Sequence, residues 1–208
     1  MNRRAFLRLA LLTLGGCTIP PSLVFRPPPT PTPLPGTEVC SDLPVTTPPY
    51  PASPPDADLY DASTGLHVKN YQVINIDPVS YRLKVTGLVD HPLEFALVDL
   101  CSMPRMTSKV TCSCTGYFDD TTTYTGVPLS YVLRLAGVQS AAVEADLIGA
   151  DGLSVSNAIE DVMKDDNFLA YQWKGMPLPA QNGFPLRAVL PSMLGYHWTK
   201  YLMEIKIA

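Results

Sequence analysis

The sequence predicts a mostly β domain of the α+β class over residues 59–208, with mixed sheets and short helices. Two observations predict this class. Apolar and polar residues alternate with a period of two in short runs, of which residues 81–87 are the clearest. The helical patterns between these runs are few and short, so a doubly wound sheet with a helix after each strand is not expected.

Further strands are indicated by apolar or β-branched runs that turn residues bound. They are expected over residues 93–96, 143–148, 153–156, 168–173, 186–190 and 201–207. Three helices are expected between them. The first covers residues 98–103, and the second has Pro128 in its first turn and ends at Gly137. The third covers residues 157–163, with Asn157 near its N-terminal cap.

The first 17 residues are typical of an export signal. Arg3 and Arg4 precede a short apolar core over residues 9–14, which is too short to span a bilayer, and the pattern resembles a twin-arginine signal. Residues 14–17 resemble a lipobox, in which Cys17 would be lipidated and become the mature N-terminus. An ordinary cleaved signal and a short uncleaved anchor are the alternatives. We expect an exported lipoprotein, anchored to a membrane on the periplasmic or extracellular face.

Residues 18–58 have the composition of an extended linker. Fourteen of the 22 prolines lie between residues 18 and 55, among serines and threonines and with little charge. Such a segment cannot bury a core and favours polyproline II, at ~3 Å per residue. A spacer between the membrane and the domain is expected, and a proline-rich recognition tract is the less common use of such a segment.

The composition of the whole chain limits the classes of function. It is 46% hydrophobic with a formal net charge of -4, which suits a globular core and offers no basic face for nucleic acid. The three histidines are scattered, and neither a zinc pattern nor a motif for covalent haem is present.

The cysteines other than Cys17 allow several pairings. In an oxidising compartment, Cys40 and Cys101 are candidates for a disulfide. Cys112 and Cys114 are two residues apart on a strand, so their side chains point the same way. These two thiols, or Cys101 with Cys112, are also candidates for a redox or structural pair without a metal.

Cys114 lies at the end of a β-branched run, two residues before Gly116. Most cysteines in apolar strands are small buried hydrophobes. A thiol at the mouth of a strand is also well placed to ligate a soft metal as the thiolate. Together with the turn at residues 124–129, which opens a helix, this segment resembles the molybdenum-ligating segment of the sulfite oxidase-like molybdopterin-binding domain (oxidoreductase molybdopterin-binding domain).

Three further motifs extend this resemblance over residues 67–208 in order. In residues 68–71, Asn70 matches the family, Lys69 replaces a cation that helps sulfite oxidases hold their anionic substrate, and Tyr71 replaces a histidine. Residues 181–187 match most closely the form found in catalytic subunits of periplasmic methionine sulfoxide reductases. Residues 195–201 resemble the family's phosphate-binding loop, with His197 in place of a lysine.

The resemblance implies a molybdenum-molybdopterin oxidoreductase that acts on a small molecule by oxygen-atom transfer, or by reduction of a sulfoxide or N-oxide. It implies Cys114 as the catalytic residue and metal ligand. It implies contacts with the cofactor by Asn70, Asn182, Arg187, Trp198, Thr199 and Lys200. Lys69, Tyr117, Asp119 and Tyr124 are the candidates for the substrate pocket. Electrons would be exchanged with a separate redox partner, either a haem membrane protein or a cytochrome.

Some positions depart from the family's pattern. Sulfite oxidases carry an arginine where Asp119 and Asp120 stand, so an anionic substrate should be repelled. Gly149 replaces a serine or threonine that relatives place near the cofactor. With the changes at Tyr71 and His197, these departures leave a second hypothesis open, namely a cofactor-free domain of the same fold that acts as a binding module at the cell surface. The retained cysteine, asparagine, arginine and lysine favour the enzyme.

Overall fold

The computed structural model describes residues 59–61, 65–68 and 73–208. The signal and linker predicted for residues 1–58 lie outside this part, with Cys17 and Cys40, and so do Lys69, Asn70 and Tyr71. No helix in the described part is long and apolar enough to cross a membrane.

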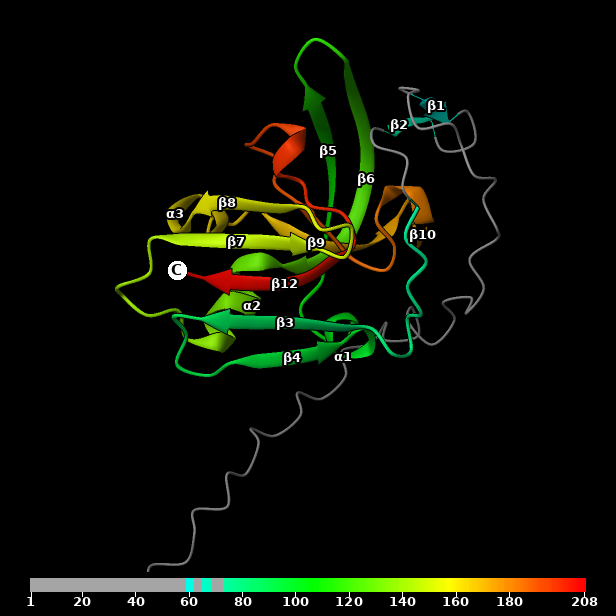
Figure 1. Ribbon diagram of the computed structural model, residues 1–208. Helices are drawn as coiled ribbons and strands as arrows, with labels where there is room; N and C mark the ends of the chain where they lie inside the picture. The colour runs from blue at the N-terminus through cyan, green and yellow to red at the C-terminus, as the bar shows by residue number, and fades with distance from the viewer. Residues whose placement is uncertain (1–58, 62–64, 69–72) are drawn as a thin grey trace, which may run out of the picture. The chain divides into compact units, whose positions relative to one another are not determined.

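Two five-stranded sheets form the domain, which confirms the predicted α+β class with mixed pairing (Figure 1). The first sheet has the order β4-β3-β12-β7-β8, in which β12 pairs parallel with β3 and antiparallel with β7. Its strands are β3 (Arg82–Gly87), β4 (Leu93–Ala96), β7 (Glu144–Gly149), β8 (Ser154–Ala158) and β12 (Leu202–Ile207).

The second sheet has the order β10-β9-β6-β5, and β11 also pairs with β9. Its strands are β5 (Met106–Cys114), β6 (Phe118–Pro128), β9 (Phe168–Trp173), β10 (Met176–Pro177) and β11 (Arg187–Val189). Every residue of β9 is buried, because this strand lies inside the sheet and carries both β6 and β11. A separate short hairpin joins β1 (Leu59–Asp61) to β2 (Leu66–Val68).

The helices are short, as expected. They are α1 (Leu97–Cys101), α2 (Leu129–Ala136) and α3 (Ile159–Val162), with 3-10 turns η2 (Ala180–Asn182) and η3 (Gly195–His197). Pro128 is the N-cap of α2, and Gly137 ends that helix with a left-handed φ of 68°. Leu129, Val132 and Leu133 are fully buried, so the helix packs one face on the core.

The prediction for α3 was wrong at its start. Asn157 lies in β8, and the N-cap of the helix is Ala158. The Asn157 side chain donates instead to the carbonyl of Val155 at 3.0 Å. A local hydrogen bond in the strand therefore takes the place of the predicted cap.

The sequence analysis missed β6, which was interpreted as a turn that leads into a helix. Residues 118–128 pair with β5 over the length of that strand, and Figure 1 shows the two as a long hairpin. A Cβ on Gly126 would lie 2.0 Å from the carbonyl oxygen of Leu169 in β9. The glycine therefore marks a close approach of two strands, not a turn.

Candidate active site

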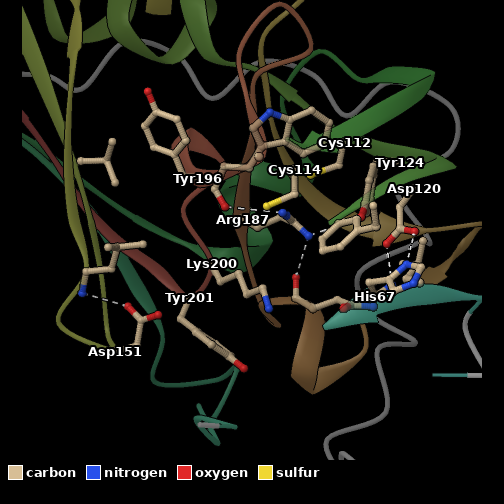
Figure 2. Close-up of a pocket in the computed structure, with 17 residues that line it drawn as sticks. His67, Cys112, Cys114, Asp120, Tyr124, Asp151, Arg187, Tyr196, Lys200 and Tyr201 are labelled. Atoms are coloured by element: carbon tan, nitrogen blue, oxygen red, sulfur yellow. Dashed lines mark hydrogen bonds and ion pairs between the residues drawn. The ribbon is translucent and has the colours of Figure 1, made fainter. Parts of the chain in front are cut away.

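A cavity of about 330 Å³ lies between the β5–β6 hairpin, β2, the turn after β7 and the segment from η3 to β12. Figure 2 shows Arg187 and Lys200 near its middle. His67 and Asp120 lie on one side of them, and Tyr196 and Asp151 lie on the other. Chain segments that are far apart in the sequence thus contribute charged and aromatic side chains to one space.

Two thiols come from the end of β5. Cys112 and Cys114 are free, half-buried and both line the cavity, as expected for residues on the same face of a strand. Burial raises the pKa of Cys112, whereas the nearby Arg187 lowers it. A Cβ on Gly195 would lie 2.9 Å from the Cys112 sulfur, so η3 packs directly on this strand.

Neither of these thiols forms a disulfide in the structure. Cys101 is disulfide-bonded, and its partner lies outside the described residues, as does Cys40. The structure therefore contains no disulfide between Cys112 and Cys114, or between Cys101 and Cys112.

Arg187, the first residue of β11, is a buried cation with 6% of its surface exposed. Its Nη1 donates to the Tyr124 hydroxyl and to the Asn182 carbonyl, both at 3.3 Å, and its Nη2 donates to the Trp198 carbonyl at 3.4 Å. Its Nε has no hydrogen-bond acceptor.

The charge of Arg187 is also not paired within the described part of the chain. The salt bridges there join His67 to Asp120 and Lys164 to Asp161, so no described carboxylate lies within 4.0 Å of Arg187. A buried charge without a counterion is strongly unfavourable. The cavity is therefore suited to an anionic group beside this guanidinium.

Asn182 and Lys200 add donors to the same wall. Asn182 is 2% exposed, and its Nδ2 has no hydrogen-bond partner. The Lys200 ammonium donates to the Gln181 carbonyl at 3.0 Å. Burial and the charge of Arg187 lower the pKa of Lys200 to about 8, although Asp151 opposes this shift.

The two other residues predicted from the phosphate-binding loop lie in different surroundings. Trp198 is buried, lines the cavity, and donates from its indole nitrogen to the Leu190 carbonyl at 2.8 Å. Thr199 is fully buried and is not part of the cavity wall. Its hydroxyl donates to the Leu147 carbonyl at 3.5 Å, and its backbone N–H donates to the His197 carbonyl at 3.0 Å.

Of the three candidates for the substrate pocket that lie in the described part of the chain, Tyr124 alone lines the cavity. Tyr117 is 62% exposed at the tip of the β5–β6 hairpin, and Asp119 is exposed beside it. Neither residue reaches the cavity wall. Lys69 lies outside the described residues, as does Asn70 from the cofactor set.

His67, Phe118 and Asp120 form one cluster on the cavity wall, and the sequence analysis named only Asp120 among them, as one of two acidic residues that replace an arginine. The backbone N–H of His67 donates to one oxygen of Asp120, and its Nδ1 lies 2.7 Å from the other. The imidazole stacks on Phe118, with 4.7 Å between ring centroids and 7° between planes. An alternating pattern over residues 118–124 would have placed Phe118, Asp120 and Tyr124 on one face, had this run been interpreted as a strand.

The donor set of this cavity fits a cofactor that brings both a soft metal and anionic groups. A thiol suits a soft transition metal, and a guanidinium with an ammonium suits phosphate. The Asn182 amide is able to donate to the edge of a heterocycle. The described residues contain no group of three or more His, Cys, Asp or Glu that would hold a metal. A metal at Cys114 would therefore need further ligands from an organic cofactor.

Comparisons with known proteins agree with this fit. The family model described as oxidoreductase molybdopterin binding domain matches residues 70–208. An uncharacterised oxidoreductase of Bacillus subtilis, YuiH, is 30% identical over 74% of this chain and 77% of its own length. A protein of Azospira oryzae named "putative protein-methionine-sulfoxide reductase subunit YedZ1" is 28% identical over 64% of this chain and 51% of its own length.

A solved structure shows the same fold. The sulfane dehydrogenase SoxCD from Paracoccus pantotrophus matches with a TM-score of 0.62 and 31% sequence identity. The match covers 67% of this chain and 41% of that chain, so this chain spans less than half of the SoxCD chain.

Proposed function

This chain belongs to the oxidoreductase molybdopterin binding domain family, and we propose that it is an exported, lipid-anchored reductase of sulfoxides or N-oxides. The cofactor of the family is molybdenum-molybdopterin, and the domain is an oxidoreductase domain. The substrate class, the direction of the reaction and the membrane anchor are the parts that we propose.

Arg187, which is buried in the same cavity as Cys114 and has no described carboxylate beside it, is the observation that best supports a cofactor-dependent enzyme. Arg187 Nε and Asn182 Nδ2 have no partner, although both are buried in the wall of a cavity that also exposes a free thiol. Buried polar groups without partners are rare in folded proteins and call for a ligand. A domain that only bound a partner at its surface would gain nothing from these internal groups.

Each residue of the cavity then has a chemical role. Cys114 would ligate molybdenum as its thiolate, while Arg187, Asn182 and Lys200 would hold the phosphate and the pterin edge. When bound, the cofactor supplies oxygen-atom transfer and electron storage. Trp198 packs beside the Arg187 guanidinium, whose carbon lies 5.7 Å from the centroid of the ring, and so fixes the orientation of that cation.

The reaction balances with two electrons and two protons. A sulfoxide R₂S=O takes up two electrons and two protons, the S–O bond breaks, and R₂S and water leave. The electrons would come from a separate redox protein of the haem or cytochrome class. The similarity to YedZ1, assigned as a sulfoxide reductase subunit, supports both this direction and a partner subunit.

Two of the departures from the family's pattern have physical explanations that favour the enzyme over a cofactor-free binding module. A Cβ on Gly149 would lie 2.6 Å from the Lys200 carbonyl oxygen and 2.5 Å from an oxygen of Asp151, so no larger residue fits there. His197 lies outside the cavity wall, and its Nδ1 is 2.6 Å from the Asn157 side-chain oxygen. The change at His197 therefore removes no donor from the cavity wall, and position 149 has no room for a side chain that would supply one.

Metal and pterin analysis of the protein exported by its own signal tests this proposal. Wild type should contain molybdenum and the pterin in stoichiometric amounts and should reduce a sulfoxide or N-oxide with an artificial electron donor. Cys114→Ser should lose activity and change the spectrum of the metal, because a hydroxyl is a poor ligand for a soft metal.

Cys112→Ser is the matched control, since this cysteine lies two residues away on the same cavity wall. It should keep the metal and its spectrum. Wild-type protein without molybdenum or pterin, from a host that makes the cofactor, would refute the enzyme and leave the binding module as the function to test.

A further inference from the structure

The charged groups of the cavity are divided between two walls. Arg187 and Lys200 come from β11 and from the end of the η3 loop, and they carry the positive charge. Asp120 comes from β6, on the side of the hairpin that carries the thiols, and it is the cross-strand partner of Cys112. Figure 2 shows Asp120 and His67 together on that side.

The two walls differ in what remains after the cofactor binds. Arg187 and Lys200 would pair with the phosphate of the cofactor when it is bound. Both carboxylate oxygens of Asp120 contact His67, and Asp120 forms no ion pair with either of those cations. Among the described residues of the wall that carries the thiols, Asp120 is the carboxylate that an entering substrate would meet.

Asp120 acts on the interior of the cavity because it is buried, with 8% of its surface exposed. Burial raises the pKa of Tyr124 and Arg187 opposes this shift, whereas Asp120 adds to it. The Asp120 carboxylate thus disfavours negative charge on the Tyr124 hydroxyl, and Tyr124 also lines the cavity. Asp119, one residue earlier, is exposed and does not line the cavity.

Apolar surface surrounds this carboxylate. Phe118 stacks on the His67 ring, and Leu66 is a buried neighbour in the same wall. This side of the cavity therefore offers an apolar surface next to a negative potential. Neither feature suits a small oxyanion, and both suit a neutral oxide with an apolar substituent.

We propose that Asp120 determines the substrate class: it excludes oxyanions such as sulfite, sulfate and nitrate from the metal side of the cavity and admits neutral sulfoxides or N-oxides. This inference rests on the proposed function, because it assigns a specificity residue within the same site. His67 is the positioning residue that holds the carboxylate in place.

Titration of the cofactor-loaded protein with sulfate, followed calorimetrically at constant ionic strength, tests the inference without turnover. Sulfate is a redox-inert oxyanion, so its binding reports exclusion alone. Asp120→Asn removes the charge and keeps the shape of the side chain. We expect it to bind sulfate at least about tenfold more tightly than wild type, since one unit charge acts over a few ångströms in a partly desolvated cavity.

Two further variants separate charge from structure. Asp119→Asn makes the same charge change outside the cavity and should stay within about twofold of wild type, as a screened surface charge does. His67→Gln breaks the same pair but keeps the carboxylate, so its affinity for sulfate should not rise. In Asp120→Asn, the inhibition constant for sulfate should fall by a larger factor than the factor by which the KM for methyl phenyl sulfoxide rises.

The outcomes distinguish this inference from the function on which it rests. Equal sulfate affinities of wild type and Asp120→Asn would overturn the inference, and so would equal gains in Asp120→Asn and His67→Gln. In both cases molybdenum content and sulfoxide reduction of wild type would leave the proposed function standing. Wild type that lacks molybdenum and pterin would overturn both.

Discussion

Replacement of Lys200 by methionine should stabilise the cofactor-free protein and impair the loaded one. Lys200 is a partly buried cation whose near neighbours include the like charge of Arg187. Its pKa falls from an ordinary 10.5 to about 8, which corresponds to about 3 kcal/mol against the protonated form in the folded state. Methionine has a similar length and carries no charge.

The sign of the pH dependence follows from linkage. The folded pKa lies below the unfolded pKa, so the penalty is present in full below pH 8 and disappears as the pH rises from about 8 to 10.5. Methionine also loses the hydrogen bond to the Gln181 carbonyl, so the cofactor-free Lys200→Met protein should be more stable than wild type by at most about 3 kcal/mol at pH 7, and by much less near pH 10. An anion beside Lys200 raises its pKa again, which reverses the order in the loaded protein.

Denaturant unfolding of wild type and Lys200→Met tests this, with protein from cells that cannot make the pterin, at pH 7 and pH 10. Thermal denaturation of the loaded proteins gives the second comparison. Equal stability of the two cofactor-free proteins at pH 7, or a difference that does not shrink at pH 10, would refute the reasoning. A loaded variant as stable as loaded wild type would show that Lys200 does not face an anion.

Two further predictions concern the cofactor and the anchor. Arg187→Lys keeps the charge but loses the fork that donates to Tyr124, Asn182 and Trp198, so we expect about tenfold weaker retention of molybdenum and pterin on dialysis, with circular dichroism as the check on folding. Full retention would argue against an anion at this guanidinium. Cys17→Ser should move the exported protein from the membrane fraction to the soluble fraction, and a variant that stays with membranes would refute lipidation at this residue.

Much of the fold follows from local patterns in the sequence. The strand over residues 168–173 has the predicted bounds, and α2 lies between Pro128 and Gly137 because a proline and a glycine fix the backbone at its two ends. The missed strand β6 shows the limit of such patterns. Its threonines favour a strand, but Asp119 and Asp120 do not, and the conformation of this run is set by pairing with β5 and β9.

The candidate site was also only partly predictable. Motif resemblance identified Cys114, Asn182, Arg187, Trp198 and Lys200, and the structure brings all five into the wall of one cavity. The same resemblance says nothing about residues at which this chain departs from its relatives.

The substrate side of the site was predicted less well for that reason. Tyr117 and Asp119, two of the candidates for the substrate pocket, follow Cys114 closely in the sequence. Whether their side chains reach the cavity depends instead on the hairpin turn, and on which face of β6 each residue occupies, because successive side chains of a strand point to opposite faces.

By itself, the sequence determined the types of groups that are available: a thiol at the end of a strand, an asparagine and an arginine in one motif, and a lysine near the C-terminus. Local backbone preferences and residue chemistry are sufficient for that. Only the tertiary structure decided that Arg187 is buried with no described carboxylate beside it, and that Asp120, not Asp119, lines the cavity together with His67. These properties depend on contacts between residues more than 50 positions apart, because burial and the balance of charges are set by what other parts of the chain bring to the same place.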